Sequence, residues 1–209
     1  MNLFSQKKCD AWRDALNQYD ALLLAHQVNQ LVEIDAWYRG VLPKELAERA
    51  PAYLTKEEFL EILRWKMKRG DWREYNRIRI ANIDARKIKQ TAQDAFAEAR
   101  TLADDIPTAS KEYKVPIQIL CQLDGVGPAT ASAALAAYRP DLYPFFDEWI
   151  AKQIEGLGKV AFTASYYWKY ADAIRGKARE LKKKCGDEWN AQEVGQALWV
   201  ASGGKIKVK

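Results

Sequence analysis

The sequence contains little cysteine and almost no histidine. Its three cysteines, Cys9, Cys121 and Cys185, are far apart among 209 residues, and none forms a CxxC pair. This argues against a zinc ribbon or an iron–sulfur cluster held by locally spaced cysteines. His26 is the only histidine, which removes histidine-based metal clusters. Its position in the helical apolar stretch ALLLAHQVNQL favours a structural role, and the odd cysteine count favours a reducing, intracellular setting.

Long apolar runs are also missing. No run reaches the roughly 18 apolar residues that a membrane span needs, and the opening MNLFSQKKCDAWRD lacks the apolar core of a secretory signal. We therefore expect no membrane partner and an intracellular location, nuclear if the source is a eukaryote. Disorder is excluded as the main state because the chain carries 8 Trp, 10 Tyr and 6 Phe, enough apolar surface to offset the entropy of ordering.

The apolar pattern predicts an all-α protein forming a single unit over residues 1–209. Apolar residues recur at three- and four-residue steps, and no strand-like alternation of useful length appears. We expect about nine to eleven helices. The expected elements are two helices ending near Gly40 and Pro43, a helix opened by a Thr55–Glu58 capping box and ended by Gly70, and a helical block over 73–101. After these we expect a short helix with Pro116 in its first turn, followed by helices near 146–155 and 164–184. A last helix should run from Asn190 to Gly203, before a frayed tail at 204–209.

One segment, Leu123 to Leu135, differs from the rest of the chain. It reads LDGVGPATASAAL and stands between a short apolar helix and a helix of small residues. Gly125-Val126-Gly127 allows a tight hairpin with positive φ. It also leaves backbone N–H groups at the start of the second helix, where they attract a phosphate. We predict a helix-hairpin-helix at about 116–138.

This segment resembles the helix-hairpin-helix of DNA glycosylases related to endonuclease III, whose recurrent core is L-x-G-V-G-x-x-T-A. Gly125, Val126, Gly127, Thr130 and Ala131 match that core in place. The family carries a catalytic aspartate eighteen positions after the residue that follows G-V-G-x, which is Ala129 in this chain, so the spacing falls on Asp147. The resemblance implies a two-lobed helical glycosylase fold with a catalytic Asp147. A Trp65-Lys66-Met67-Lys68-Arg69-Gly70 block is also similar to some eukaryotic relatives.

The chain departs from the family in three ways. Ala129 stands where bifunctional members carry the lysine that forms a Schiff base, so the resemblance points to a monofunctional enzyme without lyase activity by that route. The iron–sulfur cysteines of some members are absent. The residues Asp147-Glu148-Trp149 differ from the family's usual continuation, which leaves Glu148 as an alternative acid. We expect no required cofactor, although the hairpin could hold a structural monovalent cation.

Basic residues gather upstream of the hairpin. Residues 64–89 contain ten Lys and Arg against three acidic residues, with aromatic side chains interleaved, while the whole chain carries only +5. Arginines bind phosphates and stack on bases, so we predict a DNA-facing surface. Its candidate residues are Lys66, Lys68, Arg69, Arg73 and Arg77, together with Gly125, Val126, Gly127, Ala129 and Thr130 of the hairpin. Trp37, Tyr38, Trp72 and Trp149 are candidates to line a pocket for an extruded base.

Three functions remain open at this point. The first is a monofunctional base-excision DNA glycosylase acting on double-stranded DNA. The second is a non-catalytic nucleic-acid-binding protein on the same fold. The third is a chromatin interaction module whose basic face meets an acidic partner. The sequence leaves open the damaged base, the choice between DNA and RNA, and the oligomeric state.

Overall fold

A computed structural model describes residues 2–70, 74–186 and 189–204. Within these ranges the regular structure is entirely helical, which confirms the all-α prediction. Twelve α-helices are present in the described residues, one more than the upper end of the expected range. None of the helices in these ranges is long and apolar enough to cross a membrane. The tail beyond Gly204, expected to be frayed, lies outside the described residues.

Helices account for most of the described residues. In chain order they are η1 (Leu3–Ser5), α1 (Cys9–Asn17), α2 (Tyr19–Ala25), α3 (Leu31–Ala36), the π-helical turn η2 (Trp37–Val41), α4 (Leu42–Glu48), α5 (Lys56–Arg69), α6 (Glu74–Ala81), α7 (Ala85–Arg100), α8 (Lys111–Leu120), α9 (Pro128–Tyr138), α10 (Glu148–Ala151), α11 (Ala164–Cys185) and α12 (Ala191–Ala201).

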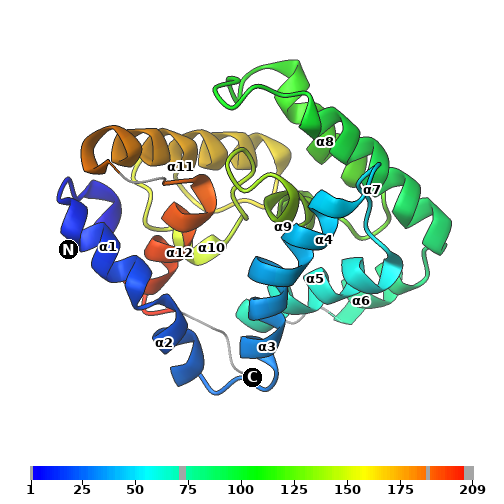
Figure 1. The fold of residues 1–209 in the computed structure, drawn as a ribbon, viewed down its shortest axis with the longest axis horizontal. Helices are drawn as coiled ribbons and strands as arrows, with labels where there is room; N and C mark the ends of the chain where they lie inside the picture. The colour runs from blue at the N-terminus through cyan, green and yellow to red at the C-terminus, as the bar shows by residue number, and fades with distance from the viewer. Residues whose placement is uncertain (1, 71–73, 187–188, 205–209) are drawn as a thin grey trace.

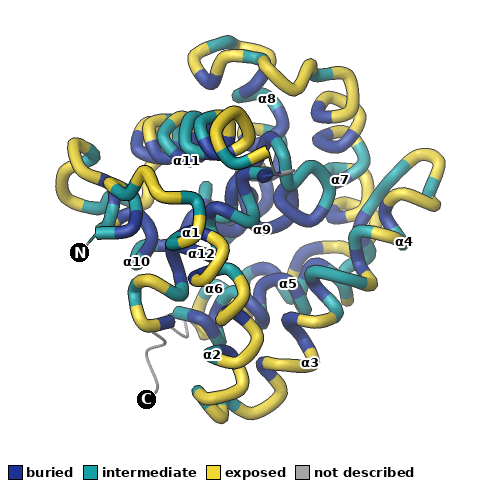
Figure 2. Tube along the Cα trace, turned by 60° about the vertical axis from the view of Figure 1, so that its left-hand side comes forward, coloured by how far each residue is buried: buried dark blue, intermediate teal, exposed yellow. Residues whose placement is uncertain are grey.

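Helix α9 lies at the centre of the molecule. Every residue from 129 to 137 is buried, and Figure 2 shows this helix dark blue among the others. Helices α4, α5, α8 and α11 all contact it. Its alanines and Ser132 make this possible, because small side chains let neighbouring helices approach closely. At the left of Figure 1, α1 packs against α12 and α11, so the first α-helix lies beside the last two.

Local capping signals located several helix ends correctly. Thr55 Oγ1 accepts the Glu58 N–H at 3.2 Å and Glu58 Oε2 accepts the Thr55 N–H at 2.8 Å, which is the predicted capping box at the start of α5. Asn190 and Glu193 make the same reciprocal pair before α12. These contacts span three residues and depend little on the rest of the fold.

Proline and glycine were misread at two places. Gly40 and Pro43 do not end a helix: Gly40 lies inside η2, and Pro43 lies in the first turn of α4, where no N–H is needed. Pro116 is not in the first turn of its helix but inside α8, which starts five residues earlier. Ser110 begins that helix by accepting the Tyr113 N–H at 3.2 Å.

Two expected helices also changed length. The block over 73–101 is divided, because Asp84 leaves the helix and caps α7 by accepting the N–H groups of Arg86 and Lys87. The helix expected near 146–155 covers only Glu148–Ala151. Residues 143–147 before it belong to no helix and are hydrogen-bonded to α9 and α11, so α10 begins only at Glu148.

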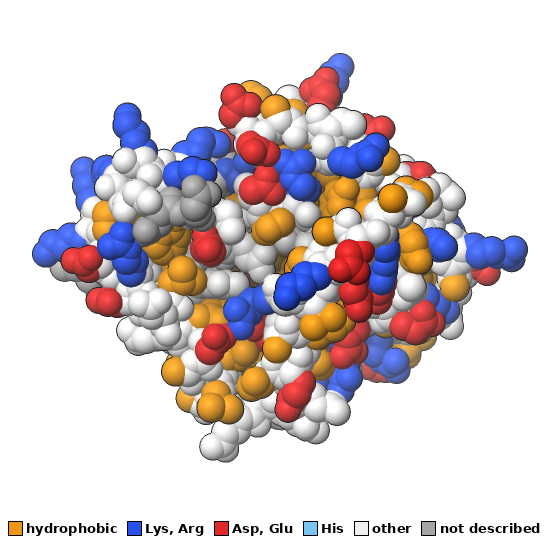
Figure 3. Space-filling view, viewed as in Figure 1, with side chains coloured by type: hydrophobic (Ala, Val, Ile, Leu, Met, Phe, Trp, Pro, Cys, Tyr) orange, Lys and Arg blue, Asp and Glu red, His pale blue; other side chains and the backbone are white. Residues whose placement is uncertain are grey.

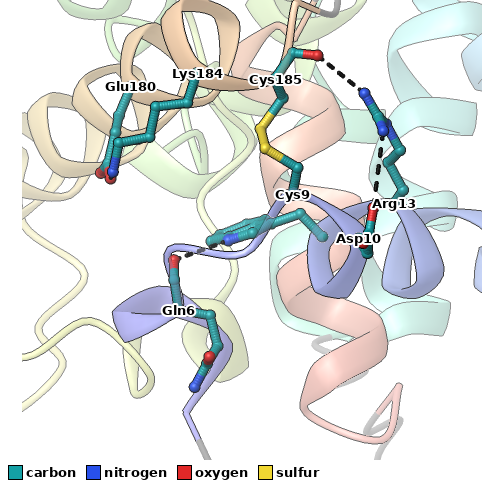
Figure 4. Close-up of a disulfide and its surroundings, with 8 residues drawn as sticks. Gln6, Cys9, Asp10, Arg13, Glu180, Lys184 and Cys185 are labelled. Carbon is teal, nitrogen blue, oxygen red and sulfur yellow. Dashed lines mark hydrogen bonds and ion pairs between the residues drawn. A yellow bond between two sulfur atoms is a disulfide. The ribbon is translucent and has the colours of Figure 1, made fainter.

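A disulfide joins Cys9 at the start of α1 to Cys185 at the end of α11 (Figure 4). Beside it, Arg13 Nη2 donates to the Cys185 carbonyl at 2.9 Å. No local pattern indicates this pairing, since 176 positions separate the two cysteines. Cys121 remains a free thiol, and burial raises its pKa to about 11. A thiol with so high a pKa is a poor nucleophile.

Candidate functional site

The segment predicted to form the hairpin lies between α8 and α9. Gly125 has φ +78°, and a Cβ placed there would lie 3.1 Å from Arg79 Cβ of α6. Gly127 instead has extended backbone, φ −107° and ψ −179°, with open space around it. Positive φ is therefore needed at only one of the two glycines. Val126 is buried and packs inward, so it supports the turn rather than facing a ligand.

Replacing Gly125 with alanine should destabilise the turn. The added Cβ meets both an unfavourable positive φ and the α6 backbone, so we expect a loss of about 1–3 kcal/mol in the free energy of unfolding. Gly127→Ala is the matched control and should change stability by less than about 1 kcal/mol, because its backbone is one that any residue adopts. Urea denaturation of both variants checks the prediction. Equal losses would show that the turn does not impose the Gly125 conformation.

The N-cap of α9 is exposed and supplies no side-chain cap, whereas the helix is buried from Ala129 onward. Gly127 is the N-cap, Pro128 follows as the first helical residue, and the Gly127 carbonyl accepts the N–H groups of Thr130 and Ala131. Orphan N–H groups at such a helix start carry the positive end of the helix dipole and suit an anion. Phosphate binding at the start of α9 stays a prediction, because the Thr130 N–H is already donated to the Gly127 carbonyl and Pro128 has no N–H.

The segment from α9 to Asp147 is fixed by hydroxyl groups. The bonds are Tyr113 Oη to the Leu142 carbonyl at 2.8 Å, Tyr167 Oη to the Pro144 carbonyl at 3.2 Å, Tyr170 Oη to the Phe145 carbonyl at 2.8 Å, and the Phe146 N–H to Ser132 Oγ at 3.0 Å. Backbone groups of an irregular segment need such partners when buried. Three helices, α8, α9 and α11, therefore determine where Asp147 lies.

Asp147 has two differently used oxygens. Oδ1 caps α10 by accepting the N–H groups of Trp149 at 2.8 Å and Ile150 at 3.4 Å. Oδ2 lies 3.9 Å from Arg69 Nη2. The side chain is only 6% exposed. Burial raises the pKa of Asp147, while Arg69 and the two N–H groups act to lower it. The cap uses Oδ1 alone, so Oδ2 is left to face Arg69.

Asp147 and the hairpin line one cavity of about 140 Å³. From the predicted set it contains Lys66, Arg69, Gly125, Gly127, Ala129, Thr130, Asp147, Glu148 and Trp149. The sequence spacing thus brought the hairpin, the acidic pair and part of the Trp65–Gly70 block to one place. The cavity holds both charged groups and aromatic rings, which is the usual composition of a small-molecule or base pocket.

Glu148 is the more exposed acid of the pair. Its side chain is 21% exposed, and Oε1 lies 3.3 Å from Lys152 Nζ one helical turn later. Asp147 instead lies deeper and faces a buried cation. A carboxylate with a perturbed pKa in a cavity is the better candidate for chemistry, so the geometry favours Asp147 over the alternative Glu148.

The predicted basic surface does not form one face. Arg69 was predicted to lie on the DNA-facing surface, but it is only 4% exposed and is buried among aromatic rings. Lys68 turns away from the cavity and donates to the Asn29 carbonyl. Arg77 is exposed and paired with Glu74. Arg73 lies outside the described residues. Figure 3 shows basic and acidic side chains interspersed over the face in view.

The aromatic candidates are similarly divided. Trp149 lines the cavity, whereas Tyr38 is buried and stacks on Trp65 with ring centroids 3.7 Å apart. Trp37 lies apart from the cavity beside Glu33 and Arg64, and Trp72 lies outside the described residues. Helical periodicity could not separate these roles, because both core and pocket aromatics occupy inward positions.

Sequence reasoning missed several residues of the site. Phe145, Phe146 and Phe162 line the cavity, with Phe146 and Phe162 ring centroids 5.4 Å apart, and Asn76 of α6 joins them. Phe145 and Phe146 directly precede Asp147, which was an available signal. Asp35 was also missed, and no pattern in the sequence around it indicates its role. In the structure it is fully buried against Arg69.

No protein-family model matches this chain, and no curated protein or solved structure matches it either. Among the described residues, no group of three or more His, Cys, Asp or Glu side chains could hold a metal ion.

Proposed function

We propose that this chain binds DNA through the hairpin and releases a base by cleaving its N-glycosidic bond, with Asp147 as the acidic residue. The observation that carries the proposal is that Asp147 shares one cavity with Gly125, Gly127 and Ala129. A phosphate held at the start of α9 would place the neighbouring nucleotide at the mouth of that cavity. The resemblance to the glycosylases adds the substrate class and is consistent with this arrangement.

The chemistry requires a carboxylate for a specific reason. Breaking the N-glycosidic bond builds positive charge on the deoxyribose, and an ionised carboxylate stabilises that oxocarbenium-like state and orients the attacking water. The base must first leave the stack, which costs a few kcal/mol and is offset by rings that receive it. Trp149, Phe145 and Phe162 supply such rings here. Ala129 has no amine, so we expect base release without strand cleavage by the lysine route.

Gly127→Val should weaken DNA binding while preserving the fold. The position has extended backbone and open space, so valine fits the structure but obstructs the approach of a phosphate. We expect a loss of about tenfold or more in affinity for duplex DNA, and a slope of log affinity against log salt that is smaller by about 0.9 for the lost phosphate contact. A salt-controlled fluorescence titration of the two proteins measures both. Unchanged affinity at every salt concentration would refute the role of the hairpin.

Incubation of the purified protein with a panel of damaged duplexes tests the chemical half of the proposal. Released base is measured by chromatography, and abasic sites are measured by alkaline cleavage. Release from at least one duplex supports the glycosylase. Binding without release from any of them would leave the non-catalytic nucleic-acid-binding function, and absence of both would favour an interaction module with an acidic protein partner.

A further inference from the structure

Arg69 is a buried cation at the last position of α5. Its guanidinium carbon lies 4.5 Å from the ring centroid of Trp199, 5.0 Å from that of Trp65 and 5.6 Å from that of Tyr19. A planar guanidinium stacks on such rings in a way that lysine cannot. Three aromatic side chains from α2, α5 and α12 therefore fix both the position and the plane of this group.

The guanidinium reaches a carboxylate on each side. Nη1 lies 3.5 Å from Asp35 Oδ1, and Nη2 lies 3.9 Å from Asp147 Oδ2. Burying a charge is costly unless another charge compensates for it. Arg69 is thus compensated by both aspartates, one in the interior and one at the cavity.

Asp35 does not depend on Arg69 for its own partners. Its Oδ1 accepts from Tyr19 Oη at 2.9 Å and from Trp65 Nε1 at 2.7 Å, and its Oδ2 accepts from Arg39 Nε at 2.6 Å. Asp35 is therefore satisfied by hydrogen bonds and by Arg39. What Arg69 adds is a positive charge between this satisfied carboxylate and Asp147.

We propose that Arg69 is a positioning residue that holds the Oδ2 atom of Asp147 toward the cavity and supplies its countercharge. The expected effect of Arg69 on base release rests on the proposed function, since base release needs an ionised Asp147. This role also explains the Trp65–Gly70 block. Trp65 lies one helical turn before Arg69, stacks on its guanidinium and donates a hydrogen bond to Asp35. Lys66 and Gly70 line the cavity.

Among the residues that the structure describes, three groups face the Asp147 carboxylate from the elements packed around it. They are Arg69 from α5, Glu148 from α10 and Tyr170 from α11. Glu148 and burial raise the pKa of Asp147, and Arg69 is the side chain that lowers it. Removing the cation should therefore raise the pKa further, by about 1 unit or more for a charge at this distance.

The test is a carbon-13 NMR titration of the Asp147 carboxyl group in wild type, Arg69→Gln, Arg69→Lys and Arg175→Gln. We expect the midpoint to rise by about one pH unit in Arg69→Gln and to stay near the wild-type value in Arg69→Lys, which keeps the charge. Arg175→Gln is the matched control, since Arg175 is also buried and ring-stacked, but against Tyr113. It should leave the midpoint unchanged.

Base release provides the second readout. On the acidic limb, a midpoint higher by one unit leaves about tenfold less ionised Asp147. The single-turnover rate of Arg69→Gln should fall by that factor there and recover as the pH rises, whereas a merely structural residue would lower the rate at every pH. Wild-type protein offers a measurement without substitution, because the Arg69 Cζ resonance should shift with the same midpoint as the Asp147 carboxyl group.

An equal midpoint in wild type and Arg69→Gln would overturn the inference. If Arg69→Gln does not fold, the wild-type protein decides: an Arg69 Cζ chemical shift that does not change at the midpoint of the Asp147 titration would overturn the inference. A wild-type protein that releases no base while the midpoints shift as expected would refute the proposed function and leave the Arg69–Asp147 coupling established. The two failures are therefore distinguishable.

Discussion

Asp147→Asn should slow base release by about 100-fold to 1,000-fold and spare DNA binding. The asparagine oxygen can still accept the Trp149 and Ile150 N–H groups, so the cap of α10 is kept. What disappears is the negative charge that stabilises the oxocarbenium-like state. Removing one preorganised electrostatic contact of this kind costs about 100-fold to 1,000-fold in rate. Single-turnover release from the most reactive duplex of the panel measures the loss, and a parallel titration measures the affinity.

Glu148→Gln is the matched control for this variant. Glu148 is adjacent in sequence and lines the same cavity, but its carboxylate pairs with Lys152 and is more exposed. We expect its rate to remain within about threefold of wild type, well below the loss from removing a preorganised charge. The opposite result, with release lost in Glu148→Gln and kept in Asp147→Asn, would move the chemistry to Glu148. Equal rates in all three proteins would mean that neither carboxylate takes part.

Removing the disulfide should produce the largest loss of stability. The bond closes a loop across 176 positions, and in the chain-entropy account a link of that span stabilises the fold by up to about 5 kcal/mol. Allowing for residual structure in the unfolded chain, we expect Cys9→Ser to lose about 3 kcal/mol. For a chain of this size this lowers Tm by about 6–12 °C. Differential scanning fluorimetry checks the prediction.

Cys121→Ser is the control, because Cys121 is partly buried and carries a free thiol. Its Tm should still drop when a reductant is added, as in wild type, whereas Cys9→Ser should no longer respond to the reductant. A thiol titration under denaturing conditions should find one free thiol in wild type and three after reduction. Three thiols without reduction would show that the two cysteines are not joined in the purified protein.

Local signals in the sequence were enough to predict the helices and several of their ends. The capping boxes at Thr55 and Asn190 and the stop at Gly70 depend on contacts within one turn. The local pattern did not predict where proline lies relative to a helix, because proline occurs both at helix ends and inside helices. Pro43 and Pro116 could start, interrupt or simply occupy a helix, and the packing of neighbouring residues decided which.

Spacing also located part of the candidate site. The G-V-G hairpin and the acid eighteen positions after Ala129 line one cavity, because one helix and one tied segment of fixed length connect them. The basic residues were less informative. A count of charges along the chain cannot tell an exposed Arg77 from a buried Arg69, since the difference arises from which rings and carboxylates fold against each one.

The sequence by itself determined that the chain is all-α, where α5 and α12 begin, and that a glycine turn precedes α9. These properties follow from periodicity, caps and glycine conformation, all of which act over a few residues. Only the tertiary structure decided that Cys9 meets Cys185 and that Arg69 lies between Asp35 and Asp147. Such contacts join distant segments, and they form only because burying the surrounding rings offsets the cost of taking those charges out of water.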